Sequence, residues 1–480
     1  MTADLILGAL RGLFDIGWNT LPGPLVLLAA LLASVSSCHA LLNKRLPASA
    51  LGWIAVSWML PLYGVILYGL LGINRVRARA RALYIPGRQS DGTCASPAVS
   101  RTRQRLVDIG DSLTGTPLSG GNAVTILENG NEAYPRMLAA IRTAKTRVWL
   151  ATYIFETDEC GREFVAALAE AAERGVQVRV LIDGIGERYS RPRASKLLEQ
   201  AGVTTARFLP PRWLPPSVYI NLRNHRKILC IDDDVAFTGG MNIGGRHLVD
   251  GKGGGTADVH FEVQGPVTEQ LAEIFIQDWA FAAKAALEMP PDQEDVVAAA
   301  WCRTIVDGPD ENLDRLRSLM VAAVNNANEE VRIMSPYFLP TADLVSAMAT
   351  AALAGVRVTV ILPSDNNLPF VQWAMQAVIP RLQAQGIRFW VQPPPFSHAK
   401  LFLVDEEYAL VGSANIDARS LRLNYEIGLE IHDAACTGQL VEYFDRARAS
   451  GYEIKRETLA NRRLPWRVRD GAAWLMSPYL

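Results

Sequence analysis

Long apolar stretches without a charged side chain lie near the start of the chain. Residues 21–42 form one such run, and residues 51–73 form a second. Each run is long enough to cross a hydrocarbon core of about 30 Å as a helix. The pattern therefore predicts an N-terminal two-helix transmembrane hairpin that serves as an anchor within residues 1–83.

A cleaved signal peptide is the competing interpretation of the first run, and it would need a basic lead-in. Asp4, Arg11 and Asp15 precede the run instead, and a second apolar run comes directly after it. The membrane anchor is therefore the favoured interpretation.

Basic residues beside the two runs predict the orientation of the hairpin. The short turn between the runs contains Lys44 and Arg45, and four arginines come after the second run: Arg75, Arg77, Arg79 and Arg81. Because positive charge is enriched on the cytoplasmic side, the large C-terminal part is expected in the cytoplasm. Residues 84–121 are rich in Gly, Ser, Thr and Pro and are predicted to be a linker.

Beyond the linker, the same order of apolar and amphipathic segments occurs twice. In each copy a buried strand, an amphipathic helix and a second strand follow one another. These segments are residues 147–155, 163–174 and 176–184 in the first copy, and 331–339, 343–353 and 356–364 in the second. Alternating strands and helices predict an α/β sheet covered by helices. We expect two similar halves, residues 122–290 and 291–480, with pseudo-twofold symmetry and a site at their seam.

Charge and cysteine content narrow the class of partner. Lysine plus arginine number 48 and aspartate plus glutamate number 49, so no overall basic field exists to hold nucleic acid. The six cysteines are scattered, without a Cys-x-x-Cys pair or a zinc-like cluster, which indicates reduced, cytosolic thiols. A nuclease would need a basic groove and no anchor, so this class is disfavoured.

The strongest chemical signal is a motif that closes each copy. It consists of His-x-Lys, an Asp five residues after the Lys, and then Gly-x-x-Asn. The positions are His225, Lys227, Asp232, Gly239 and Asn242 in the first copy, and His398, Lys400, Asp405, Gly412 and Asn415 in the second. Residues two apart on a strand share a face, so each imidazole and ammonium can address one phosphate together. One imidazole can attack phosphorus while the other protonates the departing alkoxide.

These motifs resemble the HxKx4D signature that occurs twice in enzymes of the phospholipase D superfamily. The wider chain resembles bacterial cardiolipin synthases in the segments GGNAVTILENGNEAYPRML, PYFLP, VQWA, GSANIDARSLRLNYE and LMSPYL. The resemblance implies two phospholipase D-type sandwich halves in a multi-pass protein of the bacterial inner membrane. It implies transfer of a phosphatidyl group between two phosphatidylglycerols with release of glycerol. Membrane phospholipids are the expected partners, and neither a cofactor, a metal nor nucleic acid is expected.

The resemblance also implies a role for each motif residue. His225 would be the nucleophile that forms a phosphohistidine, and His398 the acid that later becomes the base. The side chains expected to donate to the non-bridging phosphate oxygens are those of Lys227, Lys400, Asn242 and Asn415. Asp232 and Asp405 complete the catalytic motif, although their position in acidic turns favours bracing of the hairpins over contact with substrate.

A carboxylate downstream of each motif is expected to orient a histidine through its second ring nitrogen. Glu426 comes after His398 in a context that matches the family, and Asp258 comes after His225 as the parallel candidate. Asp258 competes with Glu262 for this role, because its segment lacks the Trp-Arg that often precedes the residue in the family.

Other features keep two interpretations open. The remaining histidines are expected to be structural, namely His39, His247, His260 and His432. The proline-rich segments 210–219 and 392–397 are either packing loops or lipid-facing rims of the site. Arg419 and Arg422 are either head-group contacts or ordinary surface ion pairs.

The same motifs support competing functions. A phospholipase D would let water take the second step, and the motifs alone do not separate this from transfer. A non-enzymatic membrane scaffold is disfavoured by intact His, Lys and Asn in both copies. No G-x-x-x-x-G-K-[ST] phosphate loop is present, which agrees with an exchange of phosphodiesters that needs no nucleotide.

Overall fold

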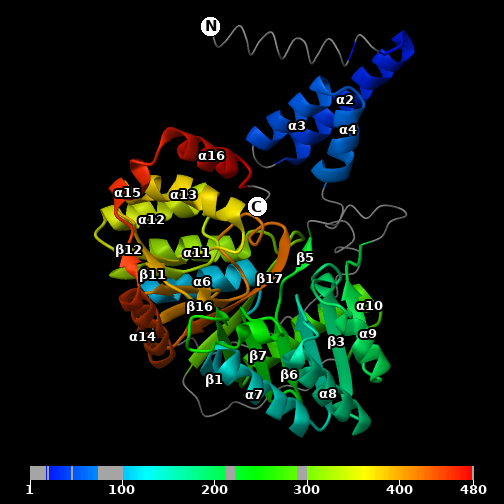
Figure 1. Cartoon of the computed structure of the whole chain (residues 1–480), viewed down its shortest axis with the longest axis vertical. Helices are drawn as coiled ribbons and strands as arrows, with labels where there is room; N and C mark the ends of the chain where they lie inside the picture. The colour runs from blue at the N-terminus through cyan, green and yellow to red at the C-terminus, as the bar shows by residue number, and fades with distance from the viewer. Residues whose placement is uncertain are drawn as a thin grey trace. The chain divides into compact units, whose positions relative to one another are not determined.

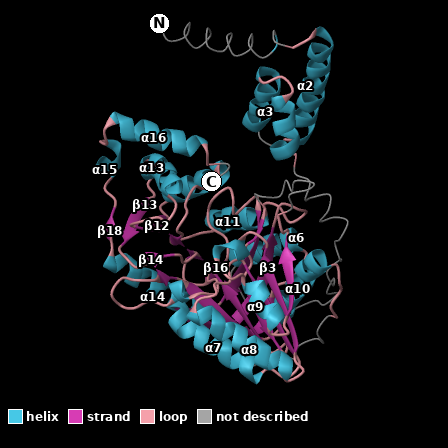
Figure 2. Ribbon diagram, turned by 45° about the vertical axis from the view of Figure 1, so that its right-hand side comes forward, coloured by secondary structure: helices cyan, strands magenta, loops and turns pink. Residues whose placement is uncertain are grey.

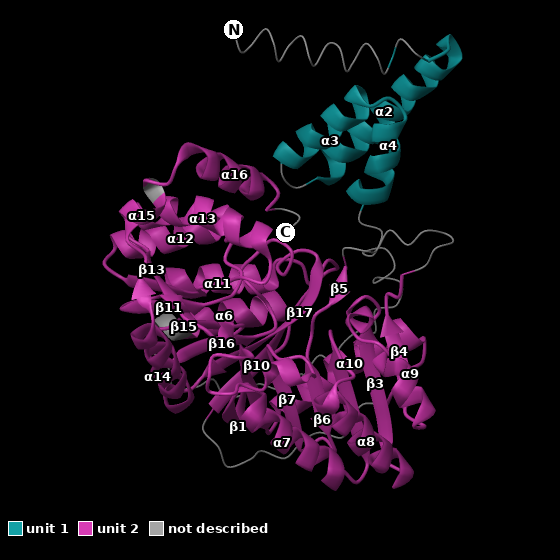
Figure 3. Ribbon diagram, viewed as in Figure 1, with its two compact units in different colours: residues 1–79 teal, residues 80–480 magenta. Residues whose placement is uncertain are grey.

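The structure is a computed structural model, and it describes residues 18, 21–44, 47–73, 101–211, 222–288 and 300–477. The chain divides into two compact units, residues 1–79 and residues 80–480 (Figure 3).

The first unit is a group of apolar helices. They are α2 (Gly23–Asn43), α3 (Pro47–Met59) and α4 (Tyr63–Leu67), which continues as the π-helix η1 (Tyr68–Gly72). Among the described residues, α2 is the one helix long and apolar enough to cross a membrane.

The second apolar run, residues 51–73, does not form the single spanning helix that its composition predicts. It is interrupted between Met59 and Tyr63, where Pro61 lacks the N–H that would continue the helix and Leu62 has a positive φ of 66°. Gly64 then packs so closely on the backbone of Val56 that a side chain would collide there. The two-pass prediction is therefore corrected to one long helix and a second run that turns back on itself.

The second unit contains the two α/β halves that the repeat predicts (Figure 1). Most of its strands form one continuous sheet in the order β18-β13-β12-β11-β15-β16-β17-β10-β1-β9-β7-β6-β2-β3-β4, with β5 added beside β17, and β14 and β8 form a separate two-stranded sheet. Strands β2, β3 and β4 are parallel in the first half, as are β11, β12 and β13 in the second. The halves meet where β1 pairs with β10 in antiparallel fashion.

Helix α6 (Arg101–Thr114) precedes the two halves. The elements of the first half are, in chain order, β1 (Ser119–Glu128), α7 (Asn129–Thr143), β2 (Arg147–Thr152), α8 (Glu159–Glu173), β3 (Gln177–Asp183), the 3₁₀ helix η2 (Gly186–Tyr189), α9 (Ala194–Gln200), β4 (Thr204–Phe208), β5 (Arg223–Asn224), β6 (Ile228–Ile231), β7 (Val235–Gly239), the 3₁₀ helix η3 (Gly245–His247), β8 (Thr256–Ala257), β9 (Val259–Gln264) and α10 (Val267–Ala283).

The elements of the second half are β10 (Ala300–Asp307), α11 (Arg315–Asn325), β11 (Glu330–Met334), α12 (Ala342–Leu353), β12 (Arg357–Pro363), α13 (Pro369–Gln383), β13 (Arg388–Gln392), β14 (Phe396–Ser397), β15 (Leu401–Val404), β16 (Tyr408–Gly412), β17 (Asn424–His432), α14 (Ala434–Ser450), β18 (Tyr452–Glu453), α15 (Arg456–Ala460) and α16 (Leu464–Leu475).

Helices cover both faces of the sheet because both faces of its strands are apolar. In β2, Val148 and Leu150 belong to the core beneath α7 and α8, which lie side by side in Figure 2. Trp149 points the other way and stacks on Phe275 of α10, with ring centroids 5.5 Å apart. A continuous apolar strand is the pattern expected of a sheet that is buried on both sides.

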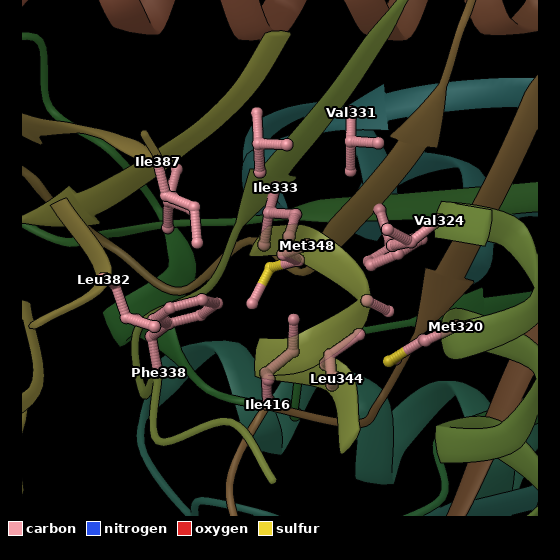
Figure 4. Close-up of a cluster of buried hydrophobic side chains, with 14 of the residues drawn as sticks. Met320, Val324, Val331, Ile333, Phe338, Leu344, Met348, Leu382, Ile387 and Ile416 are labelled. Atoms are coloured by element: carbon pink, nitrogen blue, oxygen red, sulfur yellow. The ribbon is translucent and has the colours of Figure 1, made fainter. Parts of the chain in front are cut away.

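An equivalent core lies in the second half (Figure 4). Ile333 of β11 and Phe338 pack with Leu344 and Met348 of α12, and all four side chains are fully or almost fully buried. Phe402 and Val404 of β15, the strand that follows the His-x-Lys of the second motif, belong to the same core.

The predicted linker is corrected in its C-terminal part, where α6 occupies residues 101–114. The helix packs on the second half, because Leu106 belongs to the core of that half and Asp111 pairs with Arg303 of β10. Arg303 is fully buried, and its Nε and Nη2 donate to Glu430 Oε2 at 2.8 and 2.6 Å. A side chain at Gly110 would collide with the same guanidinium. The Gly, Ser, Thr and Pro content of residues 84–121 as a whole concealed this helix, which contributes both Leu106 and Asp111 to its contact with the second half.

We predict that Arg303→Met destabilises the catalytic unit by about 3–5 kcal/mol, because it leaves the buried Glu430 carboxylate without its cation. The matched control is Arg388→Met, which removes an exposed pair with Glu453 worth about 0–1 kcal/mol. Thermal unfolding of the two variants and the parent would measure the difference. Equal melting temperatures for both variants would contradict the assigned role of Arg303.

Candidate active site

The two halves exchange short strands directly before the catalytic motifs. β5, which precedes His225, pairs in parallel with the start of β17, and His225 N donates to Tyr425 O at 2.9 Å. β14, which precedes His398, pairs in parallel with β8, and His398 N donates to Ala257 O at 2.7 Å. Each motif histidine is therefore held by the backbone of the opposite half.

This exchange pairs each histidine with the carboxylate of the other half. Nδ1 of His225 lies 2.9 Å from Glu426 Oε2, and Nδ1 of His398 lies 2.8 Å from Asp258 Oδ2. Both carboxylates are fully buried. The sequence had suggested each carboxylate beside the histidine upstream of it, so this pairing is corrected to one that crosses the seam.

Glu262, the rival of Asp258, lies elsewhere and pairs with Arg136 at 3.0 Å. Asp258 is thus the carboxylate that the fold brings to a motif histidine. The reason is local, because the residue before Asp258 is the one that pairs with β14.

The surroundings of the two carboxylates differ. Ser413 Oγ donates to Glu426 Oε2, and Asn424 Nδ2 donates to Glu426 Oε1 at 2.9 Å. Gly240 occupies the position equivalent to Ser413 in the first motif, and a side chain there would collide with the Asp258 carboxylate. The first half therefore requires glycine where the second half uses a hydroxyl.

The motif lysines lie between the histidines. Lys227 Nζ and Lys400 Nζ each donate to the carbonyl of the histidine two residues before, at 2.6 Å. Lys400 Nζ also lies 3.0 and 3.1 Å from the two ring nitrogens of His398. Burial lowers the pKa of Lys227 to about 7 and the pKa of Lys400 to about 8, although nearby carboxylates oppose the change.

Electrostatics fix the protonation of the His–carboxylate pairs. Burial lowers the pKa of both histidines, and with the help of Lys400 it brings the pKa of His398 to about 4. Burial would raise the pKa of the carboxylates, but Lys400 and His398 outweigh it and bring the pKa of Asp258 to about 2. His225 and Lys227 likewise lower the pKa of Glu426. At neutral pH the site therefore combines neutral imidazoles with ionised carboxylates.

The two motif asparagines differ in their contacts. Asn242 Oδ1 accepts a bond from Ile154 N at 3.2 Å, whereas the buried Oδ1 of Asn415 has no hydrogen-bond partner among the described residues. The role of both asparagines as phosphate ligands is a proposal.

The motif aspartates brace the hairpins, as their turn position favours. Asp232 accepts three backbone N–H bonds, from residues 145, 146 and 147, at 2.6–2.9 Å. Asp405 accepts backbone bonds from residues 328, 329 and 330 at 2.9–3.3 Å. Both aspartates have a positive φ, at 52° and 53°. They connect each hairpin turn to the start of the neighbouring strand, β2 or β11, which is antiparallel to the hairpin strand beside it.

Several residues of the site were missed in the sequence. Tyr153 comes directly after β2 and packs its ring edge-on against His225, with centroids 5.2 Å apart. Arg226, inside the first motif, pairs with the buried Asp278 at 2.5 Å and donates to Glu426 O at 3.1 Å. An arginine between His and Lys on a buried strand was a visible signal, since it requires a buried carboxylate partner.

The histidines outside the motifs are buried or paired, as expected. His432 Nε2 lies 3.1 Å from Glu430, and His39 Nδ1 lies 2.7 Å from Tyr68 Oη. His247 is nearer the site than a purely structural residue needs to be, because its ring lies 6.4 Å from that of His398. Burial lowers the pKa of His247 to about 3 and that of His260 to about 4.

The remaining candidates divide between the site and the surface. Most of the first proline-rich segment, 210–219, falls outside the described residues. The second segment, 392–397, ends in β14 and so has a structural duty in the strand exchange. Arg422 Nε lies 4.0 Å from Asp314, an ordinary ion pair.

Within the described ranges, His, Cys, Asp and Glu side chains form no group of three suited to a metal ion.

Comparisons with known proteins agree with this site. The family model described as "Cardiolipin synthase, PLD-like domain" matches residues 137–279 and 320–448. A cardiolipin synthase of Geobacillus kaustophilus is 30% identical over 494 aligned positions, which cover 99% of this chain and 98% of that protein. The major cardiolipin synthase of Bacillus subtilis is 33% identical over 364 positions, or 75% and 76% of the two chains.

A solved structure supports the fold independently. The phosphatidylserine synthase of Haemophilus influenzae Rd KW20 aligns with a TM-score of 0.60 at 17% identity, over 78% of this chain and 100% of that one. At this identity the likeness concerns the fold alone.

We predict that the crossed pairing is visible as energetic coupling. In a double-mutant cycle on thermal stability, Glu426→Gln and His225→Gln should couple by about 0.5–3 kcal/mol, because they share a buried hydrogen bond. The matched cycle of Glu426→Gln with His398→Gln should give a smaller term. A larger coupling within one half than across the seam would overturn the assignment.

Proposed function

The chain belongs to the family of cardiolipin synthases with a phospholipase D-like domain, and we propose that it transfers a phosphatidyl group from one phosphatidylglycerol to another with release of glycerol. The observation that carries the proposal is the crossed pair of buried His–carboxylate units. Each unit occupies Nδ1 of its imidazole and leaves Nε2 as the nitrogen for chemistry. Two such imidazoles suit a displacement in two steps.

In the first step, Nε2 of His225 attacks phosphorus and the bond to the glycerol oxygen breaks. His398 donates a proton to that oxygen, and glycerol leaves. The phosphodiester anion beside His398 favours its protonated form and so opposes the lowering of its pKa by burial. The product is a phosphatidyl group bound covalently to His225.

In the second step, His398 is neutral and accepts a proton from the hydroxyl of a second phosphatidylglycerol. The resulting oxygen attacks phosphorus, the bond to His225 breaks, and cardiolipin forms. Lys227 and Lys400, with the amides of Asn242 and Asn415, donate to the non-bridging oxygens as negative charge develops there. Water in place of the alcohol would yield phosphatidic acid.

The unequal surroundings of the histidines support the order of roles. Glu426, the partner of His225, accepts further bonds from Ser413 and Asn424, which hold it in one orientation. A fixed carboxylate aims a nucleophile. His398 has the Lys400 ammonium within 3.1 Å of both ring nitrogens, and a nearby cation makes an imidazolium a stronger acid.

The location that we infer is the bacterial inner membrane, with the catalytic unit in the cytoplasm. Helix α2 supplies one apolar span, and the arginines after residue 74 favour the cytoplasmic side for the catalytic unit. A second crossing is not part of the proposal, because the second apolar run turns back at Pro61.

We predict that the purified chain in phosphatidylglycerol vesicles forms cardiolipin and glycerol, as measured by mass spectrometry. His225→Ala should abolish the product, since it removes the nucleophile, and His398→Ala should strongly slow its formation, since it removes the group that moves protons. Arg388→Met, on the exposed pair with Glu453, is the control that should retain it. Phosphatidic acid without cardiolipin would make the protein a hydrolase, and no lipid product from the parent would refute catalysis.

A substrate with an easy leaving group should separate the roles of the histidines. With phosphatidyl p-nitrophenol, the leaving aryloxide needs no proton, so His398→Ala should release about one p-nitrophenolate per enzyme molecule. With phosphatidylglycerol the same variant should be about 10²–10⁴-fold slower than the parent. His225→Ala should release none. The opposite pattern would make His398 the nucleophile.

A further inference from the structure

The C-terminal helix α16 exposes an apolar stripe. Leu464, Val468 and Leu475 are 69%, 61% and 71% exposed, and their spacing of four and seven residues places them on one helix face. The opposite face carries Asp470 and Ala473, which are buried, and α16 packs there on α13. Figure 1 shows α16 over α13 at the edge of the second unit. The stripe is exposed to solvent, and its Leu464 and Val468 border a groove between α16 and α13.

Arginines and tryptophans border this stripe. Arg463 and Arg467 are exposed, and Trp466 and Trp474 are 49% and 36% exposed. Arg469, on the side of the helix, lies over the rings of Trp373 and Trp466, at 4.4 and 4.8 Å from their centroids. Apolar side chains bordered by arginine and tryptophan are typical of helices that lie in a membrane interface.

A second exposed apolar group continues from α16 toward the site. Leu368 and Phe370, at the start of α13, are 46% and 60% exposed. The Phe370 ring contacts the ring of Trp373, and the guanidinium of Arg469 lies over the same Trp373 ring.

The link from this group to the site runs through the ends of the parallel strands. Asn367, next to Leu368, accepts a bond from Tyr337 Oη at 2.6 Å. Tyr337 lies near Tyr189, whose ring contacts that of Tyr153 beside His225. A succession of neighbouring side chains thus connects the start of α13 with Tyr153, beside His225.

We propose that α16 and the start of α13 form a docking surface for an anionic lipid bilayer, separate from the N-terminal apolar unit. We call it the α16 surface, defined by Leu464, Val468, Leu475, Leu368 and Phe370. The apolar side chains enter the acyl boundary, and Arg463 and Arg467 contact lipid phosphates. Docking turns the site entrance to the membrane, so that a lipid head group reaches the histidines without its tails leaving the bilayer.

Charge favours a bilayer over a second protein as the occupant. Two arginines at an anionic surface contribute about 1 kcal/mol each, which corresponds to about thirtyfold tighter contact than with a neutral surface. A protein partner would have to match both the stripe and these cations, whereas an anionic bilayer supplies apolar and phosphate layers at the required depths.

Hydrogen exchange of the full chain in vesicles tests the proposal. His225→Ala is used as the background, so that the lipid composition stays fixed and the result does not depend on turnover. Amides of residues 464–475 should exchange more slowly in vesicles that contain phosphatidylglycerol than in pure phosphatidylcholine. Val468→Glu with Leu475→Glu should remove this protection, because two carboxylates oppose entry into an anionic surface.

The matched control is Leu353→Glu, at an exposed leucine of α12, which should leave the protection unchanged. Thermal unfolding would confirm that all variants are folded, as expected for exposed positions. Protection that is equal in both kinds of vesicle, or that survives the double substitution, would overturn the proposal. Protection that instead rises with protein concentration in detergent micelles would assign the surface to a second copy and also overturn it.

Discussion

The arrangement of the site depends on the reciprocal exchange of two short strands between the halves. β5 joins β17 and β14 joins β8, and each pairing ends at a motif histidine and at the residue before its carboxylate. Backbone pairing over such a short distance fixes the imidazole against Glu426 or Asp258 more firmly than side-chain packing would. A single half would bury a carboxylate without its histidine, which is a costly state. Two halves are therefore a condition of the site.

The exchange also explains how so many ionisable groups are tolerated in one buried place. Removing lysines and histidines from water lowers their pKa values. The ionised carboxylates of Glu426 and Asp258 oppose this change for the two lysines and so favour their charged forms. The site thus holds fixed donors around a space suited to a phosphate, and an incoming anion favours their charged forms. Such preorganised donors stabilise developing charge without rearrangement during the reaction.

Much of this could be predicted from the sequence, because the signals were local or repeated. The strand and helix order of the halves, the two motifs and the bracing role of Asp232 and Asp405 all follow from spacing along the chain. The partner of each histidine could not be predicted, since Glu426 is downstream of both motifs and only the fold decides which histidine it meets. The catalytic roles and the lipid specificity stay predictions.

Two other segments, helix α6 and the second apolar run, were predicted wrongly for one reason. The composition of a segment does not show which other part of the fold it contacts. Helix α6 looks like linker sequence because it lies in a segment rich in polar residues and glycine, although it packs Leu106 in the core of the second half and pairs Asp111 with the buried Arg303. The second apolar run looks like a membrane span because its residues are uncharged, but Pro61 and the close approach at Gly64 turn it back.

The two copies of the motif have diverged where catalysis needs them to differ. The residue between His and Lys is Arg226 in the first copy, held by Asp278 and by Glu426 O, but it is Ala399 in the second. Ser413 supports Glu426, whereas Gly240 only makes room for Asp258. A reaction in which one imidazole attacks and the other moves protons requires two environments rather than one repeated twice. The two pairs are therefore supported by different groups: Ser413 and Asn424 donate to Glu426, whereas the backbone N–H of Val259 donates to Asp258 and Lys400 lies against His398.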